Sequence, residues 1–277
     1  MAAIYRGMDR ATLDAAYDNT GQVADSQDYR ARWLQTSEKV RAKPASRLDL
    51  RFGERPRATL DFFPAKPGAP LFVFIPGGYW QRNEKERFSF TALGPNAHDI
   101  NVAVPGYTLA PDARLTDIVA EMRQALSFLA ERAGELGFDP ERLLVGGWSA
   151  GGHLTAAVSD HPAVAGGLPI SGIFDLEPIQ LGVLNDRVQL SADEVATLSP
   201  LNNLPARSPP LELFAGGAEL PELKRQSQAY AAAAQGRGLP VNLTMLPGHH
   251  HFSILDELQS PDGALTKAIA QMVARLG

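Results

Sequence analysis

Leu143-Leu144-Val145-Gly146-Gly147-Trp148-Ser149-Ala150-Gly151 is the stretch that decides the fold. Its first half is a short apolar run, which predicts a buried strand. The small residues that begin at Ala150 predict a tightly packed helix directly after that strand. Between the two, the G-x-S-x-G spacing is typical of a sharp, strained turn that lifts a serine hydroxyl above a sheet. Ser149 is therefore the candidate nucleophile.

Strand and helix patterns alternate on both sides of this turn. Further strands are predicted at residues 71–75, 101–105, 164–170, 211–214 and 241–246. Helices are predicted at residues 87–97, 115–135, 222–235 and 265–276. The alternation predicts a mostly parallel central sheet with helices on both faces. Two further segments, 46–52 and 58–63, predict an antiparallel hairpin before it.

One domain is predicted for residues 1–277. A chain of 277 residues with 44% hydrophobic content can bury one large core, and we find neither a repeat nor a low-complexity linker. Residues 1–43 predict a small N-terminal helical extension. Residues 175–210 are proline-rich and predict a lid-like insertion over the top of the sheet, where substrate walls commonly lie.

Composition excludes several classes of function. The net charge of −5 offers no broad basic surface, so nucleic acid is not expected as a partner. The absence of cysteine removes thiolate zinc sites and cysteine nucleophiles. No apolar run is long enough for a signal peptide or a membrane span, so we expect a cytoplasmic protein without a membrane partner. The expected partner is a small-molecule substrate, and a homodimer is left open.

The loop Pro76-Gly77-Gly78-Tyr79-Trp80 follows the strand predicted at 71–75 and precedes Ser149. In a fold with this order, such a loop supplies backbone donors for a developing oxyanion. The predicted donors are the amides of Gly78, Tyr79 and Ala150. Pro76 has no N–H and cannot donate.

The general base and its acid should follow the serine along the chain. His251 lies in a loop after the strand predicted at 241–246, and Glu219 is the first carboxylate after the strand predicted at 211–214. Glu222 and Asp175 are the rival carboxylates, Glu222 being expected to face solvent. His249 and His250 are expected to shape the loop rather than bind a metal, and His153 to be a packed structural residue.

These residues together predict an α/β-hydrolase fold, and the chain resembles the arylformamidase (kynurenine formamidase) branch of that superfamily. The branch carries H-G-G-Y-W-Q where this sequence has Pro76 to Gln81. The likeness extends to the stretches Tyr107-Thr108-Leu109-Ala110-Pro111, Gly147 to Gly151, Glu219 with Arg225-Gln226-Ser227, His251-Phe252-Ser253, and Tyr17 with Arg32-Trp33. Pro76 replaces a histidine that usually braces the oxyanion loop of the branch. The resemblance implies a triad of Ser149, Glu219 and His251 that hydrolyses N-formyl anilines without a cofactor.

Three hypotheses follow. The first is hydrolysis of a small aryl formamide, related amide or ester, with Trp80, Trp148 and Phe174, beside Tyr79, as candidate walls of an aryl pocket. Core packing is the alternative for these aromatic residues. The second hypothesis is a general carboxylesterase for short acyl esters. The third is a non-catalytic ligand-binding protein of the same fold, against which the ordered serine, acid and histidine argue.

Overall fold

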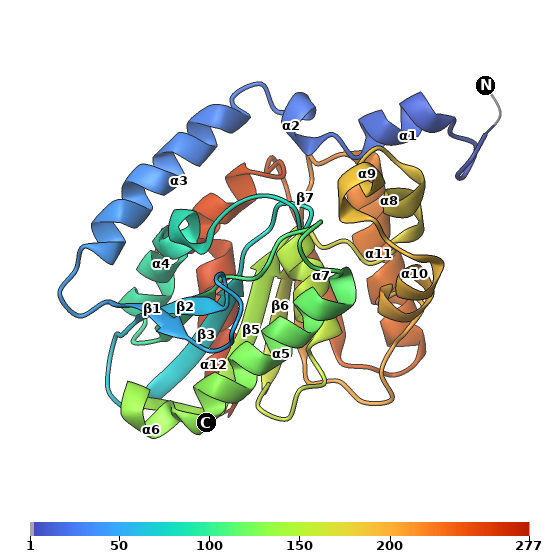
Figure 1. Ribbon diagram of the computed structural model, residues 1–277. Helices are drawn as coiled ribbons and strands as arrows, with labels where there is room; N and C mark the ends of the chain where they lie inside the picture. Colours follow the sequence, from blue (N-terminus) through green and yellow to red (C-terminus); the bar gives the residue numbers. More distant parts are fainter. Residues whose placement is uncertain (1–2, 277) are drawn as a thin grey trace.

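Eight strands form one sheet in the computed structural model, which describes residues 3–276 (Figure 1). Their order across the sheet is β1-β2-β4-β3-β5-β6-β7-β8. The bounds are β1 Arg47–Arg51, β2 Thr59–Phe63, β3 Ala69–Ile75, β4 Asn101–Pro105, β5 Phe138–Trp148, β6 Gly166–Ile170, β7 Leu211–Gly216 and β8 Val241–Leu246. β1 pairs with β2 and β2 with β4 in antiparallel fashion, and all remaining neighbours are parallel. The predicted mostly parallel sheet and its leading hairpin are confirmed.

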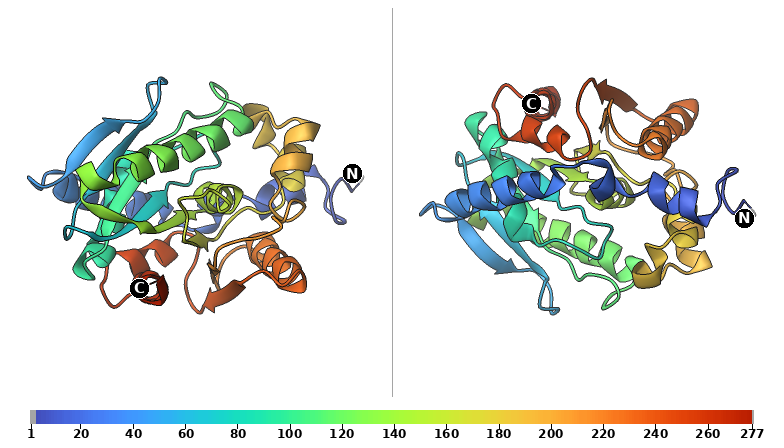
Figure 2. Two further views of the ribbon diagram at one scale, coloured as in Figure 1. Left: turned by 90° about the horizontal axis from the view of Figure 1, so that it is seen from below. Right: turned by 90° about the horizontal axis from the view of Figure 1, so that it is seen from above.

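Helices cover both faces of the sheet (Figures 1 and 2). Their bounds are α1 Arg10–Ala16, α2 Asn19–Gln22, α3 Ser26–Arg41, α4 Leu93–Ala97, α5 Leu115–Glu131, α6 Ala133–Leu136, α7 Ala150–Ala157, α8 Glu177–Leu181, α9 Asn185–Val188, α10 Ala192–Leu198, α11 Pro221–Gly236 and α12 Ala264–Leu276, with 3₁₀ segments η1 Lys85–Ala92 and η2 Ser253–Leu258. The helix predicted at 87–97 is divided between η1 and α4. The one predicted at 115–135 is divided between α5 and α6, and α6 ends at Gly137 in the left-handed conformation.

The sequence of strand β3 explains why this strand lies in the centre of the sheet. All seven are buried, and successive side chains point to opposite faces. Leu71, Val73 and Ile75 pack in the core that includes the apolar stripe of α5. Phe72 and Phe74 pack on the other face, in the core that includes the apolar residues of α12. The continuous apolar run therefore reflects burial on both sides.

The N-terminal extension crosses the top of the molecule (Figure 2, right). It contains three helices, α1 to α3, and passes over the edge of the sheet where the parallel strands end. The segment 175–210, expected to be a lid-like insertion over the top of the sheet, contains the short helices α8, α9 and α10, which lie to one side, near α11 (Figure 1). The extension thus lies over the carboxyl ends of the strands, where α/β folds place their sites.

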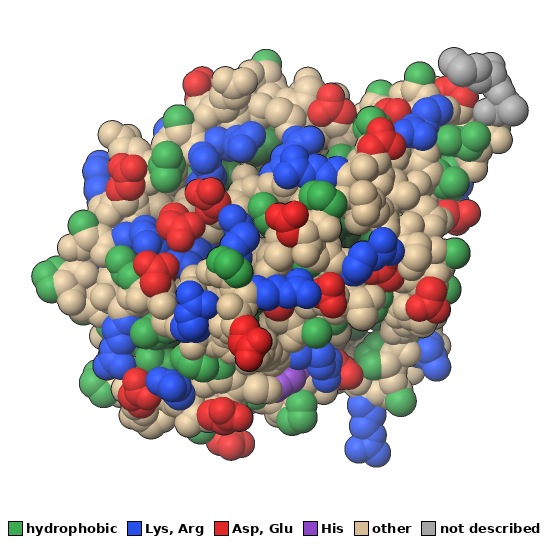
Figure 3. Space-filling model, viewed as in Figure 1, with side chains coloured by type: hydrophobic (Ala, Val, Ile, Leu, Met, Phe, Trp, Pro, Cys, Tyr) green, Lys and Arg blue, Asp and Glu red, His purple; other side chains and the backbone are tan. Residues whose placement is uncertain are grey.

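Acidic and basic side chains are interspersed on the face drawn in Figure 3. None of the helices in residues 3–276 combines the length and the apolar content needed to cross a bilayer. In the same range, no three His, Asp or Glu side chains are grouped so that they could hold a metal ion.

Candidate active site

Ser149 lies in a strained turn between β5 and α7. Its backbone has φ +59° and ψ −115°, a conformation that is costly for a residue with a side chain. A Cβ on Gly147 would lie 2.4 Å from the Gly151 carbonyl oxygen, and one on Gly151 would lie 2.0 Å from that of Ile75. Both motif glycines are therefore needed for the close approach of α7 to β3 and β5. The turn has the geometry expected of a nucleophile elbow.

Glu219 and His251 form a buried pair beside this turn. The Nδ1 atom of His251 lies 2.9 Å from Oε2 of Glu219. The other carboxylate oxygen, Oε1, accepts a hydrogen bond from the amide of Gly216 at 2.7 Å and another from the Ser171 hydroxyl. Burial alone would raise the pKa of Glu219, but the nearby His251 and these hydrogen bonds outweigh it and lower that pKa. The carboxylate is thus held ionised against the imidazole.

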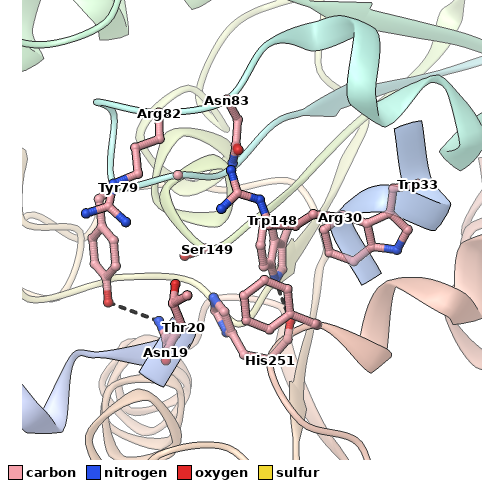
Figure 4. A pocket seen from close by; sticks show the side chains of 12 residues that line it. Asn19, Thr20, Arg30, Trp33, Tyr79, Arg82, Asn83, Trp148, Ser149 and His251 are labelled. Atoms are coloured by element: carbon pink, nitrogen blue, oxygen red, sulfur yellow. Dashed lines mark hydrogen bonds between the residues drawn. The ribbon is translucent and has the colours of Figure 1, made fainter. Parts of the chain in front are cut away.

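His251 has one ring nitrogen left for chemistry. Because a carboxylate accepts at Nδ1, that nitrogen carries the proton and Nε2 is the free position. Ser149 and His251 line the same pocket (Figure 4). Within residues 3–276 the Ser149 hydroxyl makes no hydrogen bond, and so none to Nε2 of His251. In unliganded active sites this bond is often long and tightens when substrate binds.

The predicted oxyanion donors surround Ser149. Gly78 and Tyr79 both have positive φ, +122° and +50°, and line the pocket. Among residues 3–276, the amides of Gly78, Tyr79 and Ala150 donate to no protein acceptor, which leaves them open to a substrate oxygen. A Cβ on the neighbouring Gly77 would lie 3.1 Å from that of Ser149, so the loop runs directly against the nucleophile.

Hydrogen bonds from four side chains brace the loop. The Asn83 side chain donates to the Gly77 carbonyl oxygen at 3.0 Å, and the Tyr107 hydroxyl donates to that of Pro76 at 2.9 Å. The Tyr79 hydroxyl donates to the Tyr17 carbonyl oxygen at 2.7 Å and accepts from the Asn19 amide at 3.0 Å. Fixed backbone donors need such support, because their value for an oxyanion depends on being held in place.

The structure contradicts two of the aromatic assignments. Trp80 is fully buried and packs edge-on against His153, with ring centroids 5.0 Å apart. Phe174 is fully buried and stacks flat on Tyr230 at 4.4 Å. Neither lines the pocket of Ser149, since the protein core already encloses both rings. Trp148 does line it, and its indole N–H donates to the His251 carbonyl oxygen at 2.8 Å.

The rival acids and histidines lie elsewhere. Glu222 is not solvent-facing as expected: it is partly buried, pairs with Arg225 and accepts from the Tyr17 hydroxyl. Asp175 accepts from the Tyr5 hydroxyl at 2.7 Å.

His153 is fully buried, as predicted, and burial lowers its pKa to about 4. His250 shapes the loop, because its Nδ1 accepts hydrogen bonds from the amides of Phe252 and Ser253, each at 3.2 Å.

Part of the pocket wall was missed by sequence reasoning. The N-terminal extension supplies Asn19, Thr20, Arg30 and Trp33, and the oxyanion loop continues to Arg82 and Asn83. No residue of the 175–210 insertion lines this pocket, so the expected substrate wall comes from the extension instead. Ser171, which holds Glu219, was also missed. Two of these positions carried a signal that could have been read: Arg82 lies directly behind the oxyanion motif, and Trp33 belongs to a stretch that resembles the formamidase branch.

Comparison with known proteins indicates that the chain is a hydrolase. The family model described as BD-FAE matches residues 62–162. The chain is 27% identical to the kynurenine formamidase of Danio rerio over 86% of each chain, and 28% identical to that of Salmo salar at the same coverage. It is also similar to a structure described as a candidate thioesterase from Silicibacter sp. TM1040, with TM-score 0.85 and 29% identity over 93% of this chain and 98% of the other.

Two further proteins similar to this chain are described as esterases. The chain is 24% identical to a probable isoprenylcysteine α-carbonyl methylesterase of Arabidopsis thaliana, over 79% of this chain and 53% of that one. A thermophilic carboxylesterase cloned from a metagenomic library shares the fold, with TM-score 0.72 and 20% identity over 91% of this chain and 97% of the other. The chain is a hydrolase with the α/β-hydrolase fold, and it is similar to the kynurenine formamidases over most of its length.

Proposed function

We propose that this hydrolase cleaves a small aryl formamide, or a related amide or ester, through Ser149, His251 and Glu219. The observation that carries the proposal is the buried contact of His251 with Glu219 in the wall of the pocket that holds the strained Ser149. The kynurenine formamidases, similar over most of the chain, favour a formamide of an aromatic amine. No cofactor is part of the proposal.

The chemistry follows from the positions of the three side chains. The Ser149 oxygen attacks the formyl carbon while its proton passes to Nε2 of His251. The amides of Gly78, Tyr79 and Ala150 hold the negative charge that develops on the carbonyl oxygen. The C–N bond then breaks, and His251 gives its proton to the leaving amine. Water, activated by His251, attacks the formyl-serine ester and releases formate.

Glu219 acts through His251. Its carboxylate keeps the proton on Nδ1 and stabilises the imidazolium that forms during each transfer. Oε1 is already satisfied by Gly216 and Ser171, so Oε2 is fixed on the imidazole rather than shared among partners.

Ser149→Ala tests the proposal directly. With N-formylkynurenine as substrate, we expect kcat to fall by about 10⁴-fold or more, because the covalent route is removed. Wild-type protein should react with a fluorophosphonate probe and the variant should not. Ser127→Ala is the matched control: Ser127 also lies beside a histidine, His161, at 3.1 Å, but on α5. Probe labelling that survives in Ser149→Ala would contradict the assignment.

A short-acyl carboxylesterase is the second candidate function, favoured by the esterases among the relatives. Parallel kinetics on p-nitrophenyl acetate and N-formylkynurenine separate the two functions. A ratio of kcat/KM strongly in favour of the ester would remove the formamidase assignment and leave the triad intact. A protein that binds ligand but labels with no probe would be the non-catalytic member of the fold.

A further inference from the structure

Thr20 places a hydroxyl beside the proposed nucleophile. It belongs to the short helix α2 of the N-terminal extension and lines the same pocket as Ser149 and His251. Its backbone carbonyl oxygen accepts a hydrogen bond from the Ser26 hydroxyl at 3.3 Å, whereas its side-chain hydroxyl forms none within residues 3–276. The residue is exposed, so water can satisfy this hydroxyl until a substrate displaces it.

The hydroxyl of Thr20 is directed towards Ser149. In Figure 4 the Thr20 side chain lies on the same side of the serine as the imidazole of His251, and the loop that carries Tyr79 and Arg82 runs on the other side. A substrate carbonyl at the serine turns its oxygen to the amides of that loop and its leaving atom to the general acid. Thr20 is therefore placed beside the leaving atom.

The other polar side chains of this pocket, apart from the triad, are less suited to accept a hydrogen bond there. The arginines and tryptophans among them carry donors only. Asn19 is buried, and its amide group donates to the Tyr79 hydroxyl. Asn83 lies on the far side of the nucleophile in Figure 4. The Thr20 oxygen is thus the exposed acceptor on the side of the leaving atom.

An acceptor at this point matters for an amide and not for an ester. The nitrogen of a secondary formamide keeps its hydrogen in the tetrahedral intermediate, and its lone pair must face Nε2 of His251 to take up a proton. The N–H is then directed away from His251. It needs an acceptor, because a donor left without a partner in an enclosed site costs free energy. The corresponding ester oxygen carries no hydrogen.

We propose that the Thr20 hydroxyl accepts a hydrogen bond from the N–H of the scissile formamide while the C–N bond breaks, and so favours amides over esters. The inference rests on the proposed function, since it takes attack by Ser149 and protonation by His251 as given. No bond to Thr20 forms or breaks. The nitrogen receives one proton from Nε2 and leaves as a free aniline with the hydrogen it already had. The substrate class is then a secondary N-aryl formamide.

Formanilide and phenyl formate are the substrates that test this role. Both give the same formyl-serine ester, so their values of kcat/KM differ only in the steps that form it. Thr20→Val keeps the shape of the side chain and removes the hydroxyl. We expect it to lower kcat/KM for formanilide about tenfold or more. The value for phenyl formate, corrected for uncatalysed hydrolysis, should stay within about threefold.

Two further variants assign the effect to the hydroxyl of Thr20. Thr20→Ser returns the oxygen and should restore most of the activity on formanilide. Thr12→Val is the matched control, since Thr12 also lies in the extension, on α1, and its hydroxyl donates to Asp9 outside the pocket. Its kcat/KM should stay within about threefold of the wild-type value for both substrates.

Two results would overturn the inference and leave the formamidase function in place. One is an equal loss for amide and ester in Thr20→Val, which would mean that the residue only holds the extension in position. The other is an unchanged kcat/KM for both substrates in that variant. Wild-type protein that hydrolyses phenyl formate but neither formanilide nor N-formylkynurenine would instead refute the formamidase function, and the role of Thr20 towards amides with it.

Discussion

Glu219 is the residue at which the most interactions of the site converge. Its two oxygens receive a backbone amide, a serine hydroxyl and an imidazole, and it is buried. A buried carboxylate with this many donors stays ionised, which agrees with its lowered pKa. Its place after β7 fits the proposed acid of the site, whereas Glu222, in the first turn of α11, pairs with Arg225.

Replacing that charge should slow the reaction while keeping the fold. Glu219→Gln can still hold one hydrogen bond to His251, but it neither fixes the tautomer nor stabilises an imidazolium. We expect kcat to fall by about 10²- to 10⁴-fold, measured under saturating substrate. Glu222→Gln is the matched control and should keep kcat within about threefold. Similar losses in both variants would show that Glu219 is not the acid.

The N-terminal extension is the element that most changes the interpretation of the site. It supplies four pocket residues and both hydrogen-bond partners of the Tyr79 hydroxyl. Tyr79 also provides one of the proposed oxyanion amides, so the extension is connected to the reaction centre through a single side chain. Pro76 leaves the loop without its usual histidine, and this connection is one of the braces present instead.

Tyr79→Phe tests the brace. It removes the hydroxyl and leaves the ring, so the loop should become less firmly held while the pocket keeps its shape. We expect kcat to fall about tenfold with KM within about threefold, because only the oxyanion position is affected; complete loss of a donor would cost about 10²–10³. Tyr230→Phe, on a buried tyrosine stacked on Phe174, is the control and should leave kcat unchanged. A loss confined to KM would argue against a role in positioning the donors.

Sequence reasoning succeeded where chain order and local sterics determine the structure. The strained turn at Ser149 was predicted because only small residues fit at 147 and 151, and the hairpin and parallel sheet followed from apolar patterns. It failed for Trp80 and Phe174, because aromatic residues near a site look the same whether they face substrate or the core. It also missed Arg30 and Asn19, because a polar helix carries no signal of which distant pocket it will cover.

The free energy of unfolding of the whole molecule depends on pH, and His153 contributes to this dependence. Burial lowers its pKa to about 4 in the folded state, against an ordinary value of 6.5, although its Nε2–H donates to the Leu198 carbonyl oxygen. The unfolded chain therefore takes up this proton first. Its contribution to the free energy of unfolding is fully present above pH 6.5 and is lost as the pH falls towards 4.

His153→Gln should reduce this pH dependence. Urea unfolding at several values between pH 7 and pH 4.5 gives the slope of stability against pH, and we expect a shallower slope in the variant. Between high and low pH, the free energy of unfolding should fall by roughly 3 kcal/mol less in the variant than in the wild type, given this shift in the pKa of His153. His161 and His250, whose pKa values are also lowered, are common to both proteins. An unchanged slope would mean that His153 does not titrate in this window.

The hydrogen bond from the Trp148 indole to the His251 backbone has a consequence for how the site tolerates motion. Trp148 immediately precedes the nucleophile, and its ring also lies 4.8 Å from the imidazole, centroid to centroid. Because this contact joins the loop after β8 to the residue beside Ser149, we expect thermal movements of that loop to shift His251 and Ser149 in the same direction.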